Sequence, residues 1–281
     1  MTSSLSSNLD AARIAALCLG PAAAVDIVTV ASTGSTNADL LAAVHGNPLQ
    51  MRPTLLAAQM QTAGRGRAGR VWHTAPDAAL TFSLAWKFQC ALPGLAGLPL
   101  AVGVTLAETL AALEQPVQLK WPNDLLQDGA KLGGILIETV GEKQSNKQGN
   151  KQDDRQGRAE ATWAVIGIGL NLALPEALRS QFNSANATAL LALERSQLLA
   201  TLLNRLAAAL VEFERDGFAP FAARWNAYHA YADQAVKILD RGEVLQQGVA
   251  RGVDDTGRLL LDTDDGRMTI MAGDVSLRLQ D

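Results

Sequence analysis

The chain has 281 residues and a mass of 29.7 kDa, which is enough for one sizeable core or two smaller domains. Hydrophobic residues make up 48% and charged residues 19%, a composition that excludes disordered, collagen-like and disulfide-rich proteins. Twenty-four basic and 28 acidic residues give a net charge of -4, which excludes a bulk attraction to nucleic acid or anionic lipid.

The cysteines and the N-terminal residues predict a cytoplasmic protein. Cys18 and Cys90 have no metal-type spacing and fit a reducing compartment. We find no run of the roughly 20 apolar residues that a membrane-spanning helix needs. Residues 1–17 lack the basic start and continuous apolar stretch of a secretory signal. We therefore expect no membrane association.

The first predicted element is a short terminal helix or tail within residues 1–24. Its helical pattern ends at Gly20 and Pro21. A β-branched strand follows at 25–30, and Thr36 with Asp39 resembles a capping box that begins a helix. The remaining predicted elements of this part are a helix at 36–45, strands at 53–59 and 79–86 on either side of a glycine-rich loop, a helix at 103–113, and a strand at 117–121.

Residues 132–140 and 163–172 are apolar runs of strand length and predict a hairpin. The insert between them, 141–160, contains the tandem pattern KQSN-KQGN-KQDD-RQGR, which has no aliphatic or aromatic residue. We expect a solvated extension of the hairpin, with a nucleic-acid-binding arm as the disfavoured alternative.

Two helical patterns follow, at 196–216 and 221–231. From residue 235 the chain changes to short alternating runs separated by glycine and Asp-Gly turns, which predict a small all-β domain over 235–281. The predicted division is therefore a terminal segment at 1–24, an α/β domain at 25–234 and a β domain at 235–281.

The segment Gly64–Gly69 matches the pattern G-x-G-x-x-G, but the residues after it do not predict the helix of a dinucleotide fold. Arg70 and Val71 exclude a Walker P-loop. Arg65, Arg67 and Arg70 remain beside glycines, a combination that binds phosphate or carboxylate oxygens. A simple surface turn is the alternative.

Two further segments carry candidate side chains. Asp124 follows an apolar strand end and could hold a magnesium ion, accept a proton or cap a turn. Lys131 precedes Gly133 and Gly134, glycines that would allow close approach of a flat ligand. Lys131 could neutralise a ligand carboxylate or be an ordinary surface lysine. Asn171 could face a ligand or satisfy backbone groups.

The three histidines form neither a triad nor a metal cluster in the sequence. Arginines in a glycine loop, one lysine, one aspartate and glycine-bearing strands are typical of a site for a carboxylate and a nucleotide phosphate. An enzyme that activates an acid as an acyl adenylate needs such a site, because it must hold two anions together.

Five segments in this order resemble biotin protein ligases: Ser35-Thr36-Asn37, QTAGRGRAGRVW at 61–72, KWPND at 120–124, KLGGIL at 131–136 and GIGLN at 167–171. The resemblance covers about residues 25–281. It implies a mixed-sheet α/β (α+β) catalytic domain related to lipoate ligases, followed by an SH3-like barrel. It also implies that biotin and ATP, with Mg²⁺, give biotinyl-5′-AMP. The biotinyl group then passes to a lysine of the biotin carboxyl carrier protein of acetyl-CoA carboxylase.

The resemblance also implies roles for individual residues. The catalytic residues would be Lys131, Arg67 and Asp124, with Asp124 near the metal. The biotin-binding residues would be Ser35, Thr36, Asn37, Gln61, Arg65, Gly66, Arg67, Lys131 and Gly134. The nucleotide-binding residues would be Arg67, Trp72, Lys131, Asn171 and Arg278.

Only 34 residues precede Ser35, so we expect a monofunctional enzyme without an N-terminal DNA-binding domain. We accordingly expect no DNA partner, and a monomer or weak homodimer. Ala68 and the segment 77–79 depart from the family pattern and leave the closure of the glycine loop open. A lipoate or octanoate ligase or transferase of the same fold, and a non-catalytic biotin-binding regulator, remain the alternatives.

Overall fold

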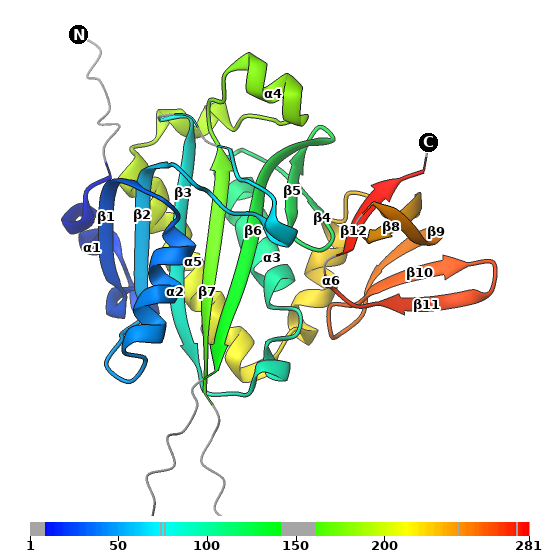
Figure 1. The fold of residues 1–281 in the computed structure, drawn as a ribbon, viewed down its shortest axis with the longest axis horizontal. Coiled ribbons are helices and arrows are strands. Elements are labelled where there is room, and N and C mark those ends of the chain that lie inside the picture. The colour runs from blue at the N-terminus through cyan, green and yellow to red at the C-terminus, as the bar shows by residue number, and fades with distance from the viewer. Residues whose placement is uncertain are drawn as a thin grey trace, which may run out of the picture.

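The computed structural model describes residues 9–73, 75, 77–141, 161–240, 242–273 and 275–280. They form a large mixed sheet with helices on both faces, and the C-terminal strands form a smaller antiparallel sheet (Figure 1). The fold is mixed α/β, as predicted.

The large sheet has the strand order β1-β2-β3-β7-β6-β5-β4. Strands β1 and β2 are parallel, and every other neighbouring pair is antiparallel. The strands are β1 (Asp26–Thr33), β2 (Thr54–Gln61), β3 (Ala79–Phe88), β4 (Gln118–Lys120), β5 (Asp124–Gln127), β6 (Ala130–Gly141) and β7 (Thr162–Asn171).

Apolar side chains on both faces of this sheet explain why helices cover each face. Leu55 and Phe82 point to one face, where α3 (Leu98–Ala112) and α5 (Arg195–Asp216) close the main core. On the other face, Leu56 and Trp163 pack with buried residues of α2 (Thr36–Gly46) in a second, smaller cluster. Side chains alternate along a strand, so neighbouring residues serve the two cores.

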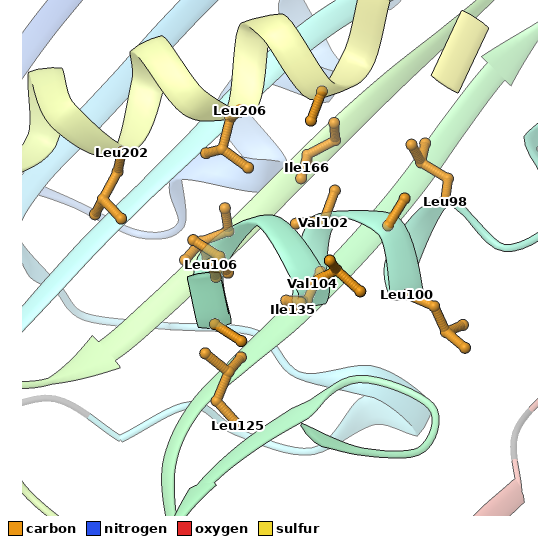
Figure 2. Packing of buried hydrophobic residues seen from close by; sticks show 14 of the residues in the cluster. Leu98, Leu100, Val102, Val104, Leu106, Leu125, Ile135, Ile166, Leu202 and Leu206 are labelled. Carbon is orange, nitrogen blue, oxygen red and sulfur yellow. The ribbon is translucent and has the colours of Figure 1, made fainter. Parts of the chain in front are cut away.

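Helix α3 lies in the middle of the main core. Leu98, Val102 and Leu106 belong to one buried cluster with Ile166 of the sheet and Leu202 of α5 (Figure 2). The segment Leu92–Ala112 is long and apolar enough to cross a membrane by length and composition, contrary to the expectation above. Two thirds of its most apolar window is buried within the fold, 67%, so its hydrophobicity matches its position in this core.

The first described residues belong to the main core and are not a frayed tail. Helix α1 (Ala11–Leu17) begins at Asp10, whose carboxylate accepts from the Arg13 amide, and packs against α5. Ile14 and Ala22 are fully buried.

The smaller sheet begins at residue 235 and has the antiparallel order β11-β10-β9-β8-β12. Its strands are β8 (Ala235–Asp240), β9 (Glu243–Val253), β10 (Leu259–Thr263), β11 (Gly266–Ile270) and β12 (Val275–Leu279). The Trp121 indole donates to the Gly257 carbonyl at 3.2 Å, and Asn226 bonds the backbone of Val253. Val253 and Leu259 join the main hydrophobic cluster, so the two sheets share a continuous core.

The structure confirms the predicted hairpin, because β6 and β7 pair from Gly133–Leu170 to Gly141–Thr162. The insert was predicted at 141–160; residue 141 is the last residue of β6, and 142–160 lie outside the described residues. Strand β5 and helix α4 (Glu176–Phe182) were not predicted. Helix α3 begins five residues earlier than expected, because Pro99 is acceptable in a first helical turn. Helix α6 (Ala219–Ala227) ends four residues early.

Candidate active site

A cleft lies on the face of the large sheet that carries α2, next to β12 of the smaller sheet. Its walls come from the start of α2, the glycine loop, the β4–β5 hairpin, β6, β7 and β12. The predicted site residues that line it are Ser35, Thr36, Asn37, Gln61, Arg65, Gly66, Arg67, Trp72, Asp124, Lys131, Gly134 and Arg278. Of the predicted site residues, Asn171 alone lies outside this lining.

The start of α2 carries a buried hydrogen-bonded network. The Thr36 amide donates to the Gln61 side-chain oxygen at 2.8 Å, and the Thr36 and Ser83 hydroxyls lie 2.7 Å apart. Ser83 donates to the Asn37 amide oxygen at 2.6 Å. Ser35 caps the helix. The side chains predicted to bind biotin are therefore held in fixed orientations at a helix N-terminus.

Two residues of this network, Ser83 and Glu138, were not predicted from the sequence. The Asn37 side-chain amide donates to Glu138 at 3.0 Å, and Arg65 forms an ion pair with the other oxygen of Glu138 at 2.9 Å. Glu138 therefore links the glycine loop to α2. Two sequence patterns could have indicated that these residues share a face with the site. In β3, Thr81 and Ser83 are polar among apolar neighbours, and in β6, Glu138 lies four residues after Gly134 and therefore on the same face of the strand.

The glycine loop is a narrow hairpin of its own. Gly66 donates to the Arg70 carbonyl at 2.7 Å and Trp72 donates to the Gly64 carbonyl at 2.9 Å. Ala68 has a φ of 52°, in the left-handed region that an alanine adopts at a cost. The hairpin directs Arg65 and Arg67 to the same cleft.

Arg67 joins the loop to both sheets. Its guanidinium donates to the Asn123 side chain at 2.9 Å and to the backbone carbonyl of Gly273. Asn123 in turn donates to the Ile135 carbonyl at 2.8 Å. Arg278 on β12 completes this side of the cleft. The smaller sheet therefore contributes residues to the site, which the sequence indicated only through Arg278.

Gly133 and Gly134 of β6 were expected to admit a flat ligand. In the structure the group beside Gly134, and beside Gly169 of β7, is the Trp72 indole. A β-carbon at Gly169 would lie 2.5 Å from the ring and one at Gly134 would lie 3.4 Å from it. A β-carbon at Gly167 would lie 2.2 Å from the Asn37 side-chain oxygen. These glycines make room for protein side chains that line the cleft.

Asp124 lies between two lysines. Its Oδ1 is 2.5 Å from the Lys131 ammonium and its Oδ2 is 3.4 Å from that of Lys120. Burial alone would raise the pKa of Asp124, but Lys131 and Lys120 together bring that pKa below its ordinary value. The Lys131 ammonium also lies 5.7 Å from the centre of the Trp72 ring. Asp124 is therefore ionised at neutral pH and held by two cations.

This donor set does not fit a metal site built by the protein. No three His, Cys, Asp or Glu side chains in the described part of the chain come together in a way that could hold a metal ion. Both oxygens of Asp124 are already paired with lysines. The predicted role of Asp124 as a magnesium ligand is not supported by this geometry.

A second hollow lies next to the cleft, and Trp72 and Lys131 line both of them. It is lined by Asn171, His73 and apolar residues of α4 and its flanks, and the His73 ring stacks on Phe182 at 4.4 Å between centroids. The Asn171 side chain donates to the Lys131 carbonyl at 3.2 Å. Asn171 therefore satisfies a backbone group, as one of the two predicted alternatives held, and it also borders this hollow.

Comparison with protein families gives two matches. Residues 31–149 match the Biotin/lipoate A/B protein ligase family, and residues 232–278 match the Biotin protein ligase C terminal domain. A biotin--[acetyl-CoA-carboxylase] ligase of Mycobacterium tuberculosis is 33% identical over 253 residues, covering 88% of this chain and 86% of the relative. The chain belongs to the biotin protein ligase family.

Other similar proteins are also named as biotin ligases. The bifunctional ligase/repressor BirA of Escherichia coli is 36% identical over 225 residues, 79% of this chain, and this chain spans 65% of that relative's length. The structure of a biotin protein ligase from Aquifex aeolicus in complex with biotin and ATP is 26% identical, has a TM-score of 0.69 and covers 90% of this chain and 99% of its own. The five-stranded β8–β12 sheet is consistent with the SH3-like domain expected of the family.

Proposed function

We propose that this chain is an ATP-dependent biotin protein ligase. It would activate biotin as biotinyl-5′-AMP and transfer the biotinyl group to a lysine of the biotin carboxyl carrier protein of acetyl-CoA carboxylase. The observation that carries the proposal is the meeting of Lys131, Arg67 and the polar start of α2 in one cleft. Such a cleft offers fixed donors to a carboxylate and a phosphate at once.

In the first step, a biotin carboxylate oxygen attacks the α-phosphorus of ATP. The bond from that phosphorus to the oxygen bridging the β-phosphorus breaks, and pyrophosphate leaves. Two anions repel each other at this point, so a nearby cation lowers the barrier. Lys131 fits that task because its ammonium faces the cleft with 34% of its side chain exposed.

In the second step, the nitrogen of the acceptor lysine attacks the biotinyl carbonyl carbon. The acyl–oxygen bond breaks, AMP leaves with that oxygen, and the amine loses a proton. Asp124 is proposed to lie close to the incoming amine, and its lowered pKa keeps it in the charged form that attracts an ammonium. Arg67 is proposed to hold the adenylate between the two steps.

The adenosine part of ATP is proposed to occupy the hollow beside Trp72. An adenine ring is flat and apolar on its faces, so it matches the aromatic walls given by Trp72, His73 and Phe182. Leu174 and Leu178 add aliphatic surface to the same hollow. Asn171 and Arg278 would act at the two sides of the nucleotide. We infer that Mg²⁺ enters bound to the ATP phosphates, because no three His, Cys, Asp or Glu side chains among the described residues come together to hold it.

The identity of the acid rests on the relatives, since one matching family model covers biotin and lipoate ligases together. The names of the curated relatives and the match to the C-terminal domain of biotin protein ligases favour biotin. A cytoplasmic location, a monomer or weak dimer, and the absence of a DNA partner belong to the same proposal.

The test is biotin-dependent exchange of labelled pyrophosphate into ATP by the purified chain, with lipoate and octanoate as parallel substrates. We expect exchange with biotin alone, followed by labelling of a purified carrier domain on one lysine. Exchange with lipoate or octanoate but not biotin would assign the chain to the sister activity. A folded chain that exchanges with no acid would be a binding protein.

A further inference from the structure

Lys120 has no assigned role, although it belongs to the K-W-P-N-D segment and lines the cleft. It stands directly opposite Asp124 in the β4–β5 hairpin. Its side chain is 11% exposed, compared with 34% for Lys131. The two lysines beside Asp124 therefore differ in access: Lys131 faces the open cleft, whereas Lys120 is enclosed.

The carboxylate of Asp124 divides its two oxygens between the two lysines. Oδ1 pairs with Lys131 at 2.5 Å and Oδ2 pairs with Lys120 at 3.4 Å. The shorter contact belongs to the lysine that the proposed reaction requires elsewhere. In the structure, then, the lysine proposed to bind the substrate is engaged by an aspartate.

This arrangement creates a competition. If Lys131 moves to a ligand carboxylate or phosphate, Asp124 loses its nearer partner. A buried carboxylate that keeps no counter-ion is strongly destabilised. With Lys120 in place, Asp124 remains paired while Lys131 binds the ligand. Without Lys120, every movement of Lys131 toward the ligand would leave Asp124 unpaired.

We propose that Lys120 is the permanent counter-ion of Asp124 and thereby releases Lys131 to bind the substrate. Lys120 is a positioning residue that acts through Asp124 and Lys131. The inference rests on the proposed function, because it requires Lys131 to bind an anionic substrate. Burial lowers the pKa of Lys120, and the positive charges of Arg278 on β12 and of Lys131 act in the same direction, whereas the Asp124 carboxylate raises that pKa.

The decisive experiment measures KM for biotin and kcat in pyrophosphate exchange. In Lys120→Met, Asp124 has Lys131 as its remaining lysine partner, so we expect KM for biotin to rise roughly tenfold with a smaller change in kcat. Lys120→Arg keeps the charge and should restore most of the affinity. Lys87→Met, on β3 and outside the cleft, serves as the matched control.

A double variant separates this role from a structural one. With Asp124→Asn there is no carboxylate charge to balance, so adding Lys120→Met should not raise KM for biotin further. The double variant also retains no unpaired buried carboxylate, so it gives the comparison even if Lys120→Met alone fails to fold. Thermal unfolding of each variant reports folding separately.

Three outcomes would overturn the proposal. The first is an unchanged KM for biotin in folded Lys120→Met. The second is an equal rise on adding Lys120→Met to the wild type and to Asp124→Asn. The third is a rise in KM for ATP alone in both backgrounds, which would make Lys120 a direct phosphate ligand. Wild-type chain that shows no biotin-dependent exchange would instead contradict the proposed function.

Discussion

The Trp72 indole packs against Gly169 of β7, so close that a β-carbon at position 169 would come within 2.5 Å of the ring. The indole nitrogen is buried and has no hydrogen-bond partner among the described residues. Trp72 is thus held by packing and not by a hydrogen bond to its indole nitrogen. It lies between the glycine-bearing strands β6 and β7 and the Lys131 ammonium. This packing fixes the wall shared by the cleft and the neighbouring hollow.

Substituting Gly169→Ala should displace the indole and weaken nucleotide binding. An added methyl group in a packed site typically costs about 1–3 kcal/mol, so we expect KM for ATP in pyrophosphate exchange to rise roughly tenfold or more. Tryptophan fluorescence should report greater exposure of a ring. Gly46→Ala is the control, because a β-carbon there meets open space. An ATP KM equal to that of the control would contradict this reading of Trp72.

Removal of the Lys131 ammonium should impair adenylation itself. Single preorganised electrostatic groups contribute on the order of 3–4 kcal/mol to transition-state stabilisation, so Lys131→Ala should reduce the exchange rate about 10²–10³-fold. The variant also leaves Asp124 with Lys120 alone, and a thermal-unfolding curve checks that the fold persists. Near-normal exchange in folded Lys131→Ala would remove the proposed catalytic role.

The loop arginine should control retention of the intermediate. Arg67 bonds Asn123 and the Gly273 carbonyl, so its loss frees the glycine loop from the smaller sheet. Arg67→Gly should therefore release biotinyl-5′-AMP faster and label lysines of a bystander protein such as serum albumin. Trapped intermediate is measured after rapid gel filtration. Equal retention of biotinyl-5′-AMP by wild type and variant would contradict the proposed role of Arg67 in holding the adenylate.

Acid should destabilise the chain through His229. This residue is 6% exposed, and its ring nitrogens have no hydrogen-bond partner in the part of the chain that the structure describes. Burial lowers the pKa of His229 from 6.5 to about 4, with Asp233 acting in the opposite direction. The unfolded chain therefore binds a proton that the folded chain does not between these values. The free energy of unfolding should fall by roughly 3 kcal/mol as pH drops from 6.5 to 4.

His229→Phe should remove this acid sensitivity, because a phenyl ring fills similar space and does not titrate. Urea unfolding at pH 7 and pH 5 measures the difference for both proteins. The packing against Trp225, at 4.7 Å between ring centroids, is retained by either ring. A variant that loses as much stability as the wild type between the two pH values would assign the acid effect to other groups.

The sequence alone predicted the family and the order of most elements, and all but one of the site residues that it indicated line the cleft. It did so because the glycine loop, the K-W-P-N-D segment and the paired glycines are local patterns whose residue types follow from their chemistry. Helix α2 was likewise predicted, because its signals are neighbours in the chain, but the predicted capping box at Thr36 and Asp39 was wrong. Ser35 is the N-cap and accepts from the Ala38 amide, whereas Asp39 accepts from the Thr33 hydroxyl. The resemblance to biotin protein ligases was confirmed by the matching family models and relatives.

Only the tertiary structure decided which groups contact one another. The pairing of Arg65 with Glu138 joins residues 73 positions apart, and Arg67 reaches a carbonyl 206 positions away. The sequence likewise gave no sign that Asp124 is shared by two lysines, or that the strand glycines receive Trp72 and Asn37. Such contacts depend on strand register and sheet order, which are set by burial of the whole core and not by any local pattern.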